Sequence, residues 1–263
     1  AILNDLSTAA TFISYNYNNP VDPSLFKTET NRILKDVEKK YGWMYDTRHK
    51  DGRKGKINYV VWSDVFRCPE CTNEVVFWDV AVDRENGKVR DEFPCPKCKA
   101  LLTKRNIERA WETKFDPGTK SSVRHIKQAP VLINYSVGTS RFEKVLDDDD
   151  FKNIEKVNST NIPEWYPVEE LPKGDKTGEP TRIGITHSHH FYSASSLAWL
   201  SAFREKCQRL DYRYLVPFSM INTISKLYRY NVKKPDYKGQ GGGILTGTLY
   251  VPSLIRGLSA SSS

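Results

Sequence analysis

Four of the five cysteines occur as two C-P-x-C pairs, Cys68 with Cys71 and Cys95 with Cys98. The 23 residues between the pairs include Glu85-Asn86-Gly87-Lys88, a sequence typical of a hairpin turn that would bring the pairs together. Each pair can form a tight turn that offers two thiolates to one metal ion. Because four thiolates in a tetrahedron suit zinc and leave no coordination position open, we predict a structural zinc site at these four cysteines.

Two disulfides, or an iron–sulfur cluster, are the alternatives for the same four cysteines. Secreted disulfide scaffolds are shorter and denser in cysteine than this chain of 263 residues with five cysteines. The N-terminus lacks the basic and then apolar pattern of a secretion signal, and no apolar run reaches the length of a transmembrane helix. We therefore expect a cytoplasmic protein without membrane contact, and a reducing cytoplasm favours zinc over disulfides.

A second group of potential ligands is His187-Ser188-His189-His190. Imidazoles are common metal ligands, and two of them placed two residues apart share one face of a strand. No carboxylate lies within a few positions to complete a ligand set, and a helix is expected shortly afterwards. We therefore expect the histidines to belong to the turn that leads into this helix. A second metal site, and a hydrolase that uses it, are the alternatives.

The chain is basic, with 40 Lys and Arg against 32 Asp and Glu, a net charge of +8 and a pI near 9.1. Such an excess suits a polyanion, because Lys and Arg neutralise the phosphates of double-stranded DNA. An ordinary solvated basic surface is the alternative. Two clusters are candidates for DNA binding, one in a glycine-containing turn and one after the second cysteine pair: Lys50, Arg53 and Lys54, and Lys97, Lys99 and Lys104.

The elements that must position these residues follow from capping residues and periodicity. Ser7 and Asp22-Pro23 are typical helix starts and Gly42 is a typical helix stop, so two helices are expected before residue 42. The alternation of apolar residues from 57 to 61 predicts a strand that leads into the first cysteine pair. Further strands are expected at 75–81, at 248–251 and in pairs around the turns at 116–118 and 138. Further helices are expected over 197–210, with Cys207 as a buried thiol, and over 221–227.

Several separate stretches resemble one protein family. Residues 4–13, NDLSTAATFI, are similar to a segment of bacterial DNA methyltransferases of the N4-cytosine/N6-adenine type, where it follows the glycine-rich S-adenosylmethionine motif. Downstream, six words resemble the long insert of a subgroup that contains a zinc ribbon: GWMYDTRHKDG, INYVVWSDVFRCPEC, EVVFWDVAVD, PVLINYSVG, GITHSHHFY and GTLYVPS. The resemblance spans nearly the whole chain.

The same resemblance shows what these 263 residues do not contain. A methyltransferase of this family has a glycine-rich strand-to-helix turn for the cofactor and an Asp/Asn-Pro-Pro-aromatic tetrapeptide that holds the flipped base, and neither occurs here. The chain is therefore similar to the section between the two motifs, where such enzymes often place target recognition. Asp5, expected at the end of an apolar strand, matches the acidic residue that in the family accepts hydrogen bonds from the cofactor ribose. A simple turn aspartate is the alternative.

These observations predict an α+β chain, in which a β-rich insert with a zinc ribbon is flanked by helices of a Rossmann-like methyltransferase core. A strand end and helices of that core are expected at 1–41, and the β-rich insert at 42–157 with the zinc ribbon at 68–98. A linker is expected at 158–182, a helical return segment at 183–258 and a disordered tail at 259–263.

The function implied by the resemblance is DNA recognition for methylation of an exocyclic amino group of adenine or cytosine, in a bacterial system of the restriction-modification type. The implied partners are double-stranded DNA and the rest of the methyltransferase polypeptide. S-adenosylmethionine would bind only in that longer parent, with Asp5 as the single cofactor contact in this chain. The alternative function is a non-enzymatic zinc-ribbon module that binds nucleic acid or another protein.

Overall fold

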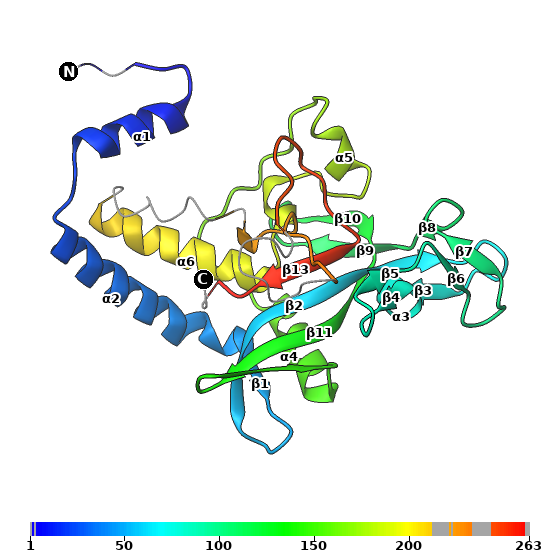
Figure 1. Ribbon diagram of the computed structural model, residues 1–263. Helices are drawn as coiled ribbons and strands as arrows, with labels where there is room; N and C mark the ends of the chain where they lie inside the picture. Colours follow the sequence, from blue (N-terminus) through cyan, green and yellow to red (C-terminus); the bar gives the residue numbers. More distant parts are fainter. Residues whose placement is uncertain (1, 3, 212–220, 222, 233–242, 261–263) are drawn as a thin grey trace.

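A long strand, β2 (Lys54–Arg67), runs through the middle of the molecule (Figure 1). The computed structural model describes residues 2, 4–211, 221, 223–232 and 243–260. Within this part of the chain, β2 pairs with β1, β3, β8, β11 and β13, and each of these pairings is antiparallel. The fold is therefore α+β with antiparallel sheets, which confirms the predicted fold class at this level.

The other elements are mostly short and lie around β2. The helical elements are α1 (Thr8–Asn18), α2 (Pro23–Tyr41), η1 (Gly42–Tyr45), α3 (Phe77–Ala81), α4 (Asp148–Ser159), α5 (Gly178–Thr181), η2 (Ser188–Phe191) and α6 (Ala194–Leu210). The remaining strands are β1 (Asp46–Arg48), β3 (Glu74–Val76), β4 (Val82–Asp83), β5 (Lys88–Val89), β6 (Glu92–Pro94), β7 (Leu101–Thr103), β8 (Glu108–Arg109), β9 (Trp111–Asp116), β10 (Ser121–Ile126), β11 (Gln128–Val137), β12 (Ser140–Lys144) and β13 (Leu254–Leu258). No helix in the described residues combines the length and the apolar composition needed to cross a membrane.

Both N-terminal helices begin where the capping residues predict. The Ser7 hydroxyl accepts a hydrogen bond from the backbone N–H of Ala10 at the start of α1, and the Asp22 carboxylate accepts one from Leu25 at the start of α2. α2 packs along α6, whereas α1 stands apart and buries none of its residues (Figure 1). Local capping therefore starts both helices, but only α2 is held by tertiary packing.

The alternation predicted for β2 is present in its first half. Ile57, Tyr59 and Val61 are buried, and the residues between them are half-buried. From Ser63 to Phe66 every residue is buried, because β3 and β8 join the strand there and the chain covers both of its faces. The two predicted strand pairs are also confirmed, as β9 with β10 and as β11 with β12.

One hydrophobic core joins segments that are far apart in the sequence. It contains Val37 of α2, Ile133 of β11 and Phe203 of α6, so the N-terminal helix, the β-rich region and the return segment are packed together. A second core around Phe77 and Phe93 lies under the cysteine pairs, and a third lies between β10, η2 and β13. Of the linker predicted at 158–182, residues 160–177 contain no helix or strand beyond an isolated bridge, but α4 extends into its start and α5 lies near its end.

The prediction of a strand over 75–81 is wrong beyond its second residue. β3 ends at Val76, and residues 77–81 form the short helix α3. Phe77 and Trp78 are adjacent, and both are buried together with Ala81. A strand on a sheet sends adjacent side chains to opposite faces, whereas one helical turn can direct all three into the same core. Burial therefore overrides the strand-like alternation of this segment.

The C-terminal predictions are also corrected. Residues 223–227 form a 3-10 turn and a bend in place of the predicted α-helix, and residue 222 lies outside the described residues. The last strand is β13 at Leu254–Leu258, not 248–251, and it pairs with β2. Pro252 has no N–H to donate, so the segment before it is a poor strand. Ser259 and Ala260 are buried, so the first two residues of the predicted disordered tail are ordered, while 261–263 lie outside the described residues.

Gly184 provides a test of the close packing between β10 and the segment that follows α5. It has a φ of +88°, and a Cβ built on it would collide with Arg124 O and lie 2.5 Å from His125 Cα. Gly184→Ala should lower the free energy of unfolding in urea by about 1–2 kcal/mol for the left-handed backbone and by about 1–3 kcal/mol more for the collision. Gly138 is the matched control, because its φ is +61° but a Cβ there would meet nothing within 4 Å. Equal losses for the two variants would contradict the close approach of β10 to residue 184.

Candidate metal centre

The two cysteine pairs form turns with the same backbone pattern. In the first turn Thr72 N donates to Cys68 O at 2.9 Å, and in the second Lys99 N donates to Cys95 O at 3.0 Å. Thr72 and Lys99 take equivalent positions with left-handed φ angles of 57° and 65°. The first turn follows the end of β2, and the second lies between β6 and β7, which pair with each other. The two sheets therefore present two equivalent turns to one another.

The four sulfur atoms gather around one point. The Sγ atoms of Cys68 and Cys98 lie 3.7 Å apart, as do those of Cys71 and Cys95. All four ligand atoms lie within 4.8 Å of one another. A zinc ion about 2.3 Å from each sulfur of a tetrahedron would separate the sulfurs by about 3.8 Å, whereas a disulfide needs about 2.05 Å. The cluster therefore has the geometry of four thiolates around a structural zinc ion, and all four cysteines are free.

Backbone N–H groups point at the thiolates. Hydrogen bonds from the N–H groups of Cys98 and Lys97 lower the pKa of Cys95 to about 6. In the same turn a hydrogen bond from Ala100 lowers the pKa of Cys98, but burial and the other three sulfurs outweigh it and raise that pKa to about 12. Because a metal binds the thiolate and not the thiol, Cys98 would have to lose its proton when a cation binds.

The apolar layer beneath the cysteine turns is more substantial than the sequence suggests. The Phe77 ring contacts the Phe66 and Phe93 rings edge-on, with ring centres 5.7 and 5.8 Å apart. An aromatic core therefore supports the four cysteines that could hold a metal ion at this end of the molecule.

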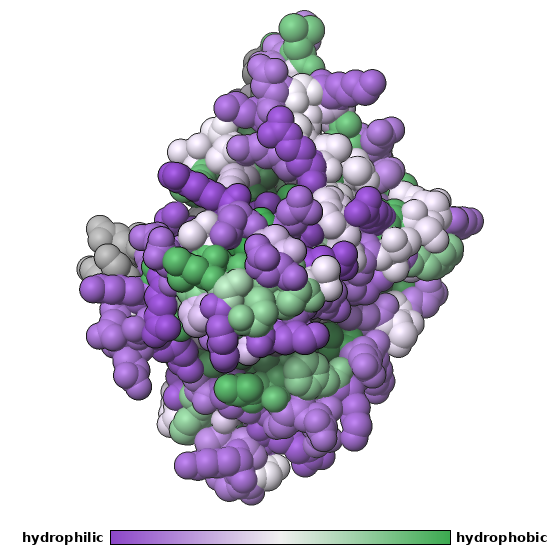
Figure 2. All heavy atoms as spheres, turned by 90° about the vertical axis from the view of Figure 1, so that its right-hand side faces the viewer, coloured by the Kyte–Doolittle hydropathy of each residue, from purple (hydrophilic) through white to green (hydrophobic). Residues whose placement is uncertain are grey.

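Three predicted DNA-binding lysines surround the second cysteine turn. Lys97, Lys99 and Lys104 are exposed. Lys99 Nζ donates to Pro96 O at 3.2 Å, and Lys104 Nζ lies 4.4 Å from the centre of the Phe77 ring. Within the described part of the chain, none of the three pairs with a carboxylate. Figure 2 looks onto this end of the molecule and shows mainly hydrophilic side chains around a smaller apolar patch.

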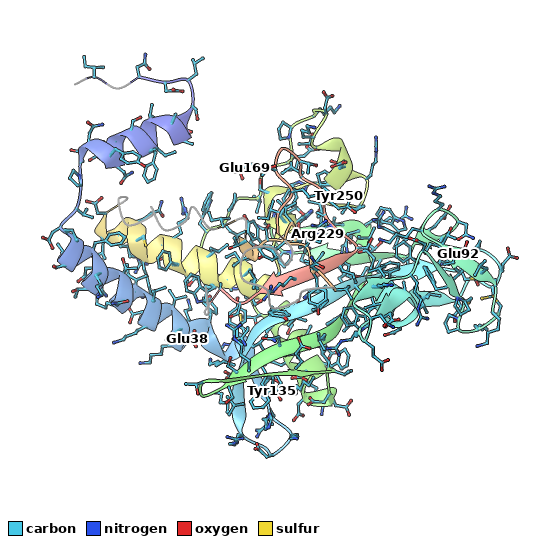
Figure 3. The ribbon with its side chains drawn as sticks, in the orientation of Figure 1. Glu38, Glu92, Tyr135, Glu169, Arg229 and Tyr250 are labelled. Atoms are coloured by element: carbon cyan, nitrogen blue, oxygen red, sulfur yellow. The ribbon has the colours of Figure 1, made fainter. Side chains whose placement is uncertain are left out.

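The other predicted cluster lies at the opposite end of β2, on the β1–β2 hairpin. Arg53 pairs with Asp51 at 2.8 Å, and Lys54 pairs with Asp46 at 2.7 Å, so Lys50 is the member without a carboxylate partner among the described residues. A buried histidine anchors this hairpin. Nδ1 of His49 lies 2.7 Å from the hydroxyl of Tyr135 on β11, which is labelled in Figure 3. The structure does not bring the two basic clusters together.

Asp5 lies in a local turn before α1. Its carboxylate accepts a hydrogen bond from the N–H of Ser7 at 2.8 Å, and its side chain is exposed. The expected apolar strand is not seen at residues 2, 4 and 5, while residues 1 and 3 lie outside the described residues. A strand needs a neighbour with which to exchange hydrogen bonds, and no described strand is paired with this segment. The role of Asp5 toward a cofactor stays a prediction.

The histidine segment has a partner that sequence reasoning missed. Asp116, at the end of β9, lies within hydrogen-bonding distance of both His189 and His190. Burial lowers the pKa of His190 to about 4. Burial raises the pKa of Asp116, but hydrogen bonds from Thr119 and the two histidines outweigh it and hold that pKa below its ordinary value.

The prediction that Cys207 is a buried thiol is confirmed, and burial raises its pKa to about 12.

The search for a carboxylate within a few residues of the histidines could not find Asp116, because 73 residues separate it from His189. The local sequence Asp116-Pro117-Gly118 predicts only a hairpin turn. Comparison of the chain with protein-family models, with curated proteins and with solved structures finds no match in any of the three. We therefore infer function from the side chains and their geometry, and from the sequence words described above.

The cysteine cluster gives a direct prediction. The purified protein should contain zinc at this site. After that zinc is exchanged for Co²⁺, the protein should show the sulfur-to-metal charge-transfer absorption of a thiolate site. Cys95→Ser should lose most of that absorption and should unfold at lower urea concentration, because one of four ligands is gone. Cys207→Ser, which removes a thiol outside the cluster, is the matched control and should keep the absorption. A Cys95→Ser spectrum equal to that of the unaltered protein would rule out this ligand set.

Proposed function

We propose that this chain is the DNA-recognition portion of an S-adenosylmethionine-dependent DNA methyltransferase that acts on an exocyclic amino group of adenine or cytosine. In this proposal the four cysteines hold a structural zinc ion and form the zinc ribbon of the family. The observation that carries it is the arrangement of the basic clusters, one on the cysteine turns and one on the hairpin at the other end of β2. The similarity of several sequence words to one methyltransferase subgroup supports the same conclusion.

The second cysteine turn and the segment after it carry mainly positive charge. From residue 97 to residue 109 the chain carries Lys97, Lys99, Lys104, Arg105 and Arg109 against the single acid Glu108. Arg109 is engaged inside the protein, where its Nε lies 2.9 Å from the Asp64 carboxylate. The three lysines have no such partner among the described residues, so they can neutralise phosphates without breaking an internal ion pair. Such contacts fix the position of a protein on DNA and do not read its sequence.

The spacing of the two clusters suits a duplex. β2 has 14 residues, and at about 3.3 Å per residue its length is roughly 45 Å. Base pairs rise by about 3.4 Å each, so a duplex lying along this direction would cover about 13 base pairs between the clusters. The anchored hairpin and the metal-bound turns are both rigid supports for phosphate contacts. Base-specific contacts would come from other side chains on the surface between them.

The N-terminal helix supports a larger parent polypeptide. α1 has no buried residue, and Leu6, Ile13 and Tyr17 expose 107, 54 and 84% of their surface around it. Apolar side chains gathered on one exposed helix commonly mark an interface. In the proposal, the rest of the methyltransferase, with its Rossmann-like sheet and bound S-adenosylmethionine, packs against this helix. The strand expected before Asp5 would then acquire the neighbouring strands that it lacks here.

DNA binding by the cysteine turns can be measured by fluorescence titration of a short duplex at several salt concentrations. The logarithm of affinity should fall linearly with the logarithm of salt, with a slope of about −0.9 for each phosphate contacted. Replacing Lys97, Lys99 and Lys104 together by Ala should make this slope less steep by about 2 to 3. Replacing Lys27, Lys35 and Lys39 of α2 removes the same charge elsewhere and should change it by less than about 1. Equal effects of the two triple variants would leave only nonspecific attraction to a basic protein.

The chain alone should transfer no methyl group. Transfer requires the cofactor methyl in line with the target nitrogen, and the chain lacks the glycine-rich turn and the tetrapeptide that seat the cofactor and the flipped base. We expect no labelled methyl in DNA and no calorimetric binding of S-adenosylmethionine. A parent that contains both motifs should show both activities, and there Asp5→Ala should weaken cofactor binding more than DNA binding. Turnover by the 263-residue chain would overturn the proposal.

A further inference from the structure

Two histidines and one aspartate converge on a buried point far from the cysteines. His189 Nε2 lies 2.9 Å and His190 Nε2 lies 3.1 Å from the same oxygen, Oδ2 of Asp116. The three side chains are only 6, 13 and 11% exposed. One potential ligand atom from each lies within 4.8 Å of the others. The other group of this kind in the described residues is the cysteine cluster.

The backbone around these residues is built to hold them. Asp116 Oδ1 accepts a hydrogen bond from Gly118 N at 2.9 Å, and Oδ2 accepts one from Thr119 Oγ1 at 2.8 Å, so the carboxylate is fixed in orientation. A Cβ on Gly118 would lie 2.9 Å from His189 Nε2, so glycine leaves the space for this imidazole. η2 is tied to the loop at Glu169 (labelled in Figure 3), whose carbonyl accepts a hydrogen bond from Ser188 N at 3.0 Å.

Charge distinguishes this cluster from an ordinary hydrogen-bonded turn. The side chain of Asp116 is only 11% exposed, and within the described part of the chain no Lys or Arg forms an ion pair with it. Its hydrogen bonds with Gly118, Thr119 and the two histidines stabilise the ionised carboxylate. The cluster therefore keeps a negative charge where the three side chains meet, and a divalent cation there would balance it. The distances fit as well, because a metal about 2.1 Å from ligands at right angles separates those ligand atoms by about 3.0 Å.

The three side chains also face a pocket. It has a volume of 360 Å³, and its walls include Asp116, His189 and His190 together with Trp62, Tyr192 and Lys226. Three protein ligands leave further coordination positions of a metal open to water or to a bound molecule. The mixed lining of aromatic rings and a few charged groups, among them Lys114, Lys226 and Glu112, is typical of a small-molecule pocket. Here the cysteine cluster differs, since its four thiolates leave no position open.

We propose that Asp116, His189 and His190 bind one divalent first-row transition metal ion, with its open coordination positions directed into this pocket. Two imidazoles and one carboxylate are the ligand set of open, reactive sites for metals such as iron or manganese. The site is independent of the function proposed above, since neither the basic clusters nor the cysteines take part in it. It gives this chain a place where a bound molecule could react, which the cysteine cluster cannot provide.

Metal binding should change the tautomer of His190. Without metal, Thr186 N donates to His190 Nδ1 at 3.3 Å, which leaves the ring proton on Nε2 facing Asp116. With Nε2 bound to a metal, the proton moves to Nδ1, where Thr186 Oγ1 at 3.5 Å is the available acceptor. In nitrogen NMR spectra of His190, the Nδ1 signal should therefore change from that of an unprotonated nitrogen to that of a protonated one when a diamagnetic ion such as Zn²⁺ is added. A shared hydrogen bond with no metal would leave this signal unchanged.

The decisive experiment is a Mn²⁺ titration of the chain loaded with one equivalent of Zn²⁺, which the four thiolates bind in preference to the Asp116 site, followed by the electron paramagnetic resonance signal of free Mn²⁺. Manganese prefers nitrogen and oxygen ligands over thiolates, so it reports on this site and not on the cysteines, and about one ion per chain should bind. His190→Ala and Asp116→Asn should weaken binding about tenfold or more. His187→Ala is the matched control, because His187 lies in the same segment but outside the ligand set, and it should bind like the unaltered protein.

Several results would overturn the site. Absence of saturable Mn²⁺ binding to the unaltered chain would do so without any variant, whether or not the variants fold. So would binding that survives in both His190→Ala and Asp116→Asn, or that His187→Ala reduces as strongly as they do. Thermal unfolding of each variant without metal identifies those that have lost their fold. If His190→Ala is among them, His190→Gln, which keeps a polar side chain of similar length, takes its place.

Discussion

Pairing along one strand is the constraint on which the rest of this structure depends. β2 forms antiparallel pairs with five other strands, and where it passes from one core to the next it carries the buried Asp64. That carboxylate is only 1% exposed, and it accepts hydrogen bonds from Arg109 Nε at 2.9 Å and from Gln128 Nε2 at 3.0 Å. Breaking one partner would leave a buried charge uncompensated. The basic hairpin begins at one end of this strand and the first cysteine turn at the other, so β2 sets the distance between them.

The parts of the fold that could be predicted are those that neighbouring residues determine. Ser7 and Asp22 cap helices through contacts three residues away, and the C-P-x-C turns close within five residues, so each was visible in the sequence. The segment from Phe77 to Ala81 was not, because its helix follows from burial of adjacent rings in a core assembled by distant strands. Asp116 was missed for a similar reason. Its contacts with the histidines span more than 70 residues, and no local pattern records them.

The two potential metal centres differ in what they could do. Four thiolates in a tetrahedron saturate a zinc ion, so the cysteine cluster can only hold β2, β6 and β7 in place. The group of Asp116, His189 and His190 has harder ligands and lies on a pocket wall, where a metal would keep positions for other molecules. Transfer of a methyl group from S-adenosylmethionine needs no metal, so the pocket would serve a purpose separate from methylation. A metal at the first centre would therefore contribute to stability, whereas a metal at the second could also take part in chemistry.

The charged runs of the chain differ in how far the fold pairs or buries them. In the strongest acidic run, from Asp147 to Asp150, only Asp150 is buried, and it forms a capping box with Asp147 at the start of α4. Lys144 pairs with both of them, at 2.7 and 2.8 Å, and Thr47 donates to Asp150 at 2.6 Å. Asp147 and Asp150 therefore stabilise the helix N-terminus, whereas Asp148 and Asp149 remain exposed. The lysines on the cysteine turns lack carboxylate partners among the described residues, so they leave unpaired positive charge at that end of β2.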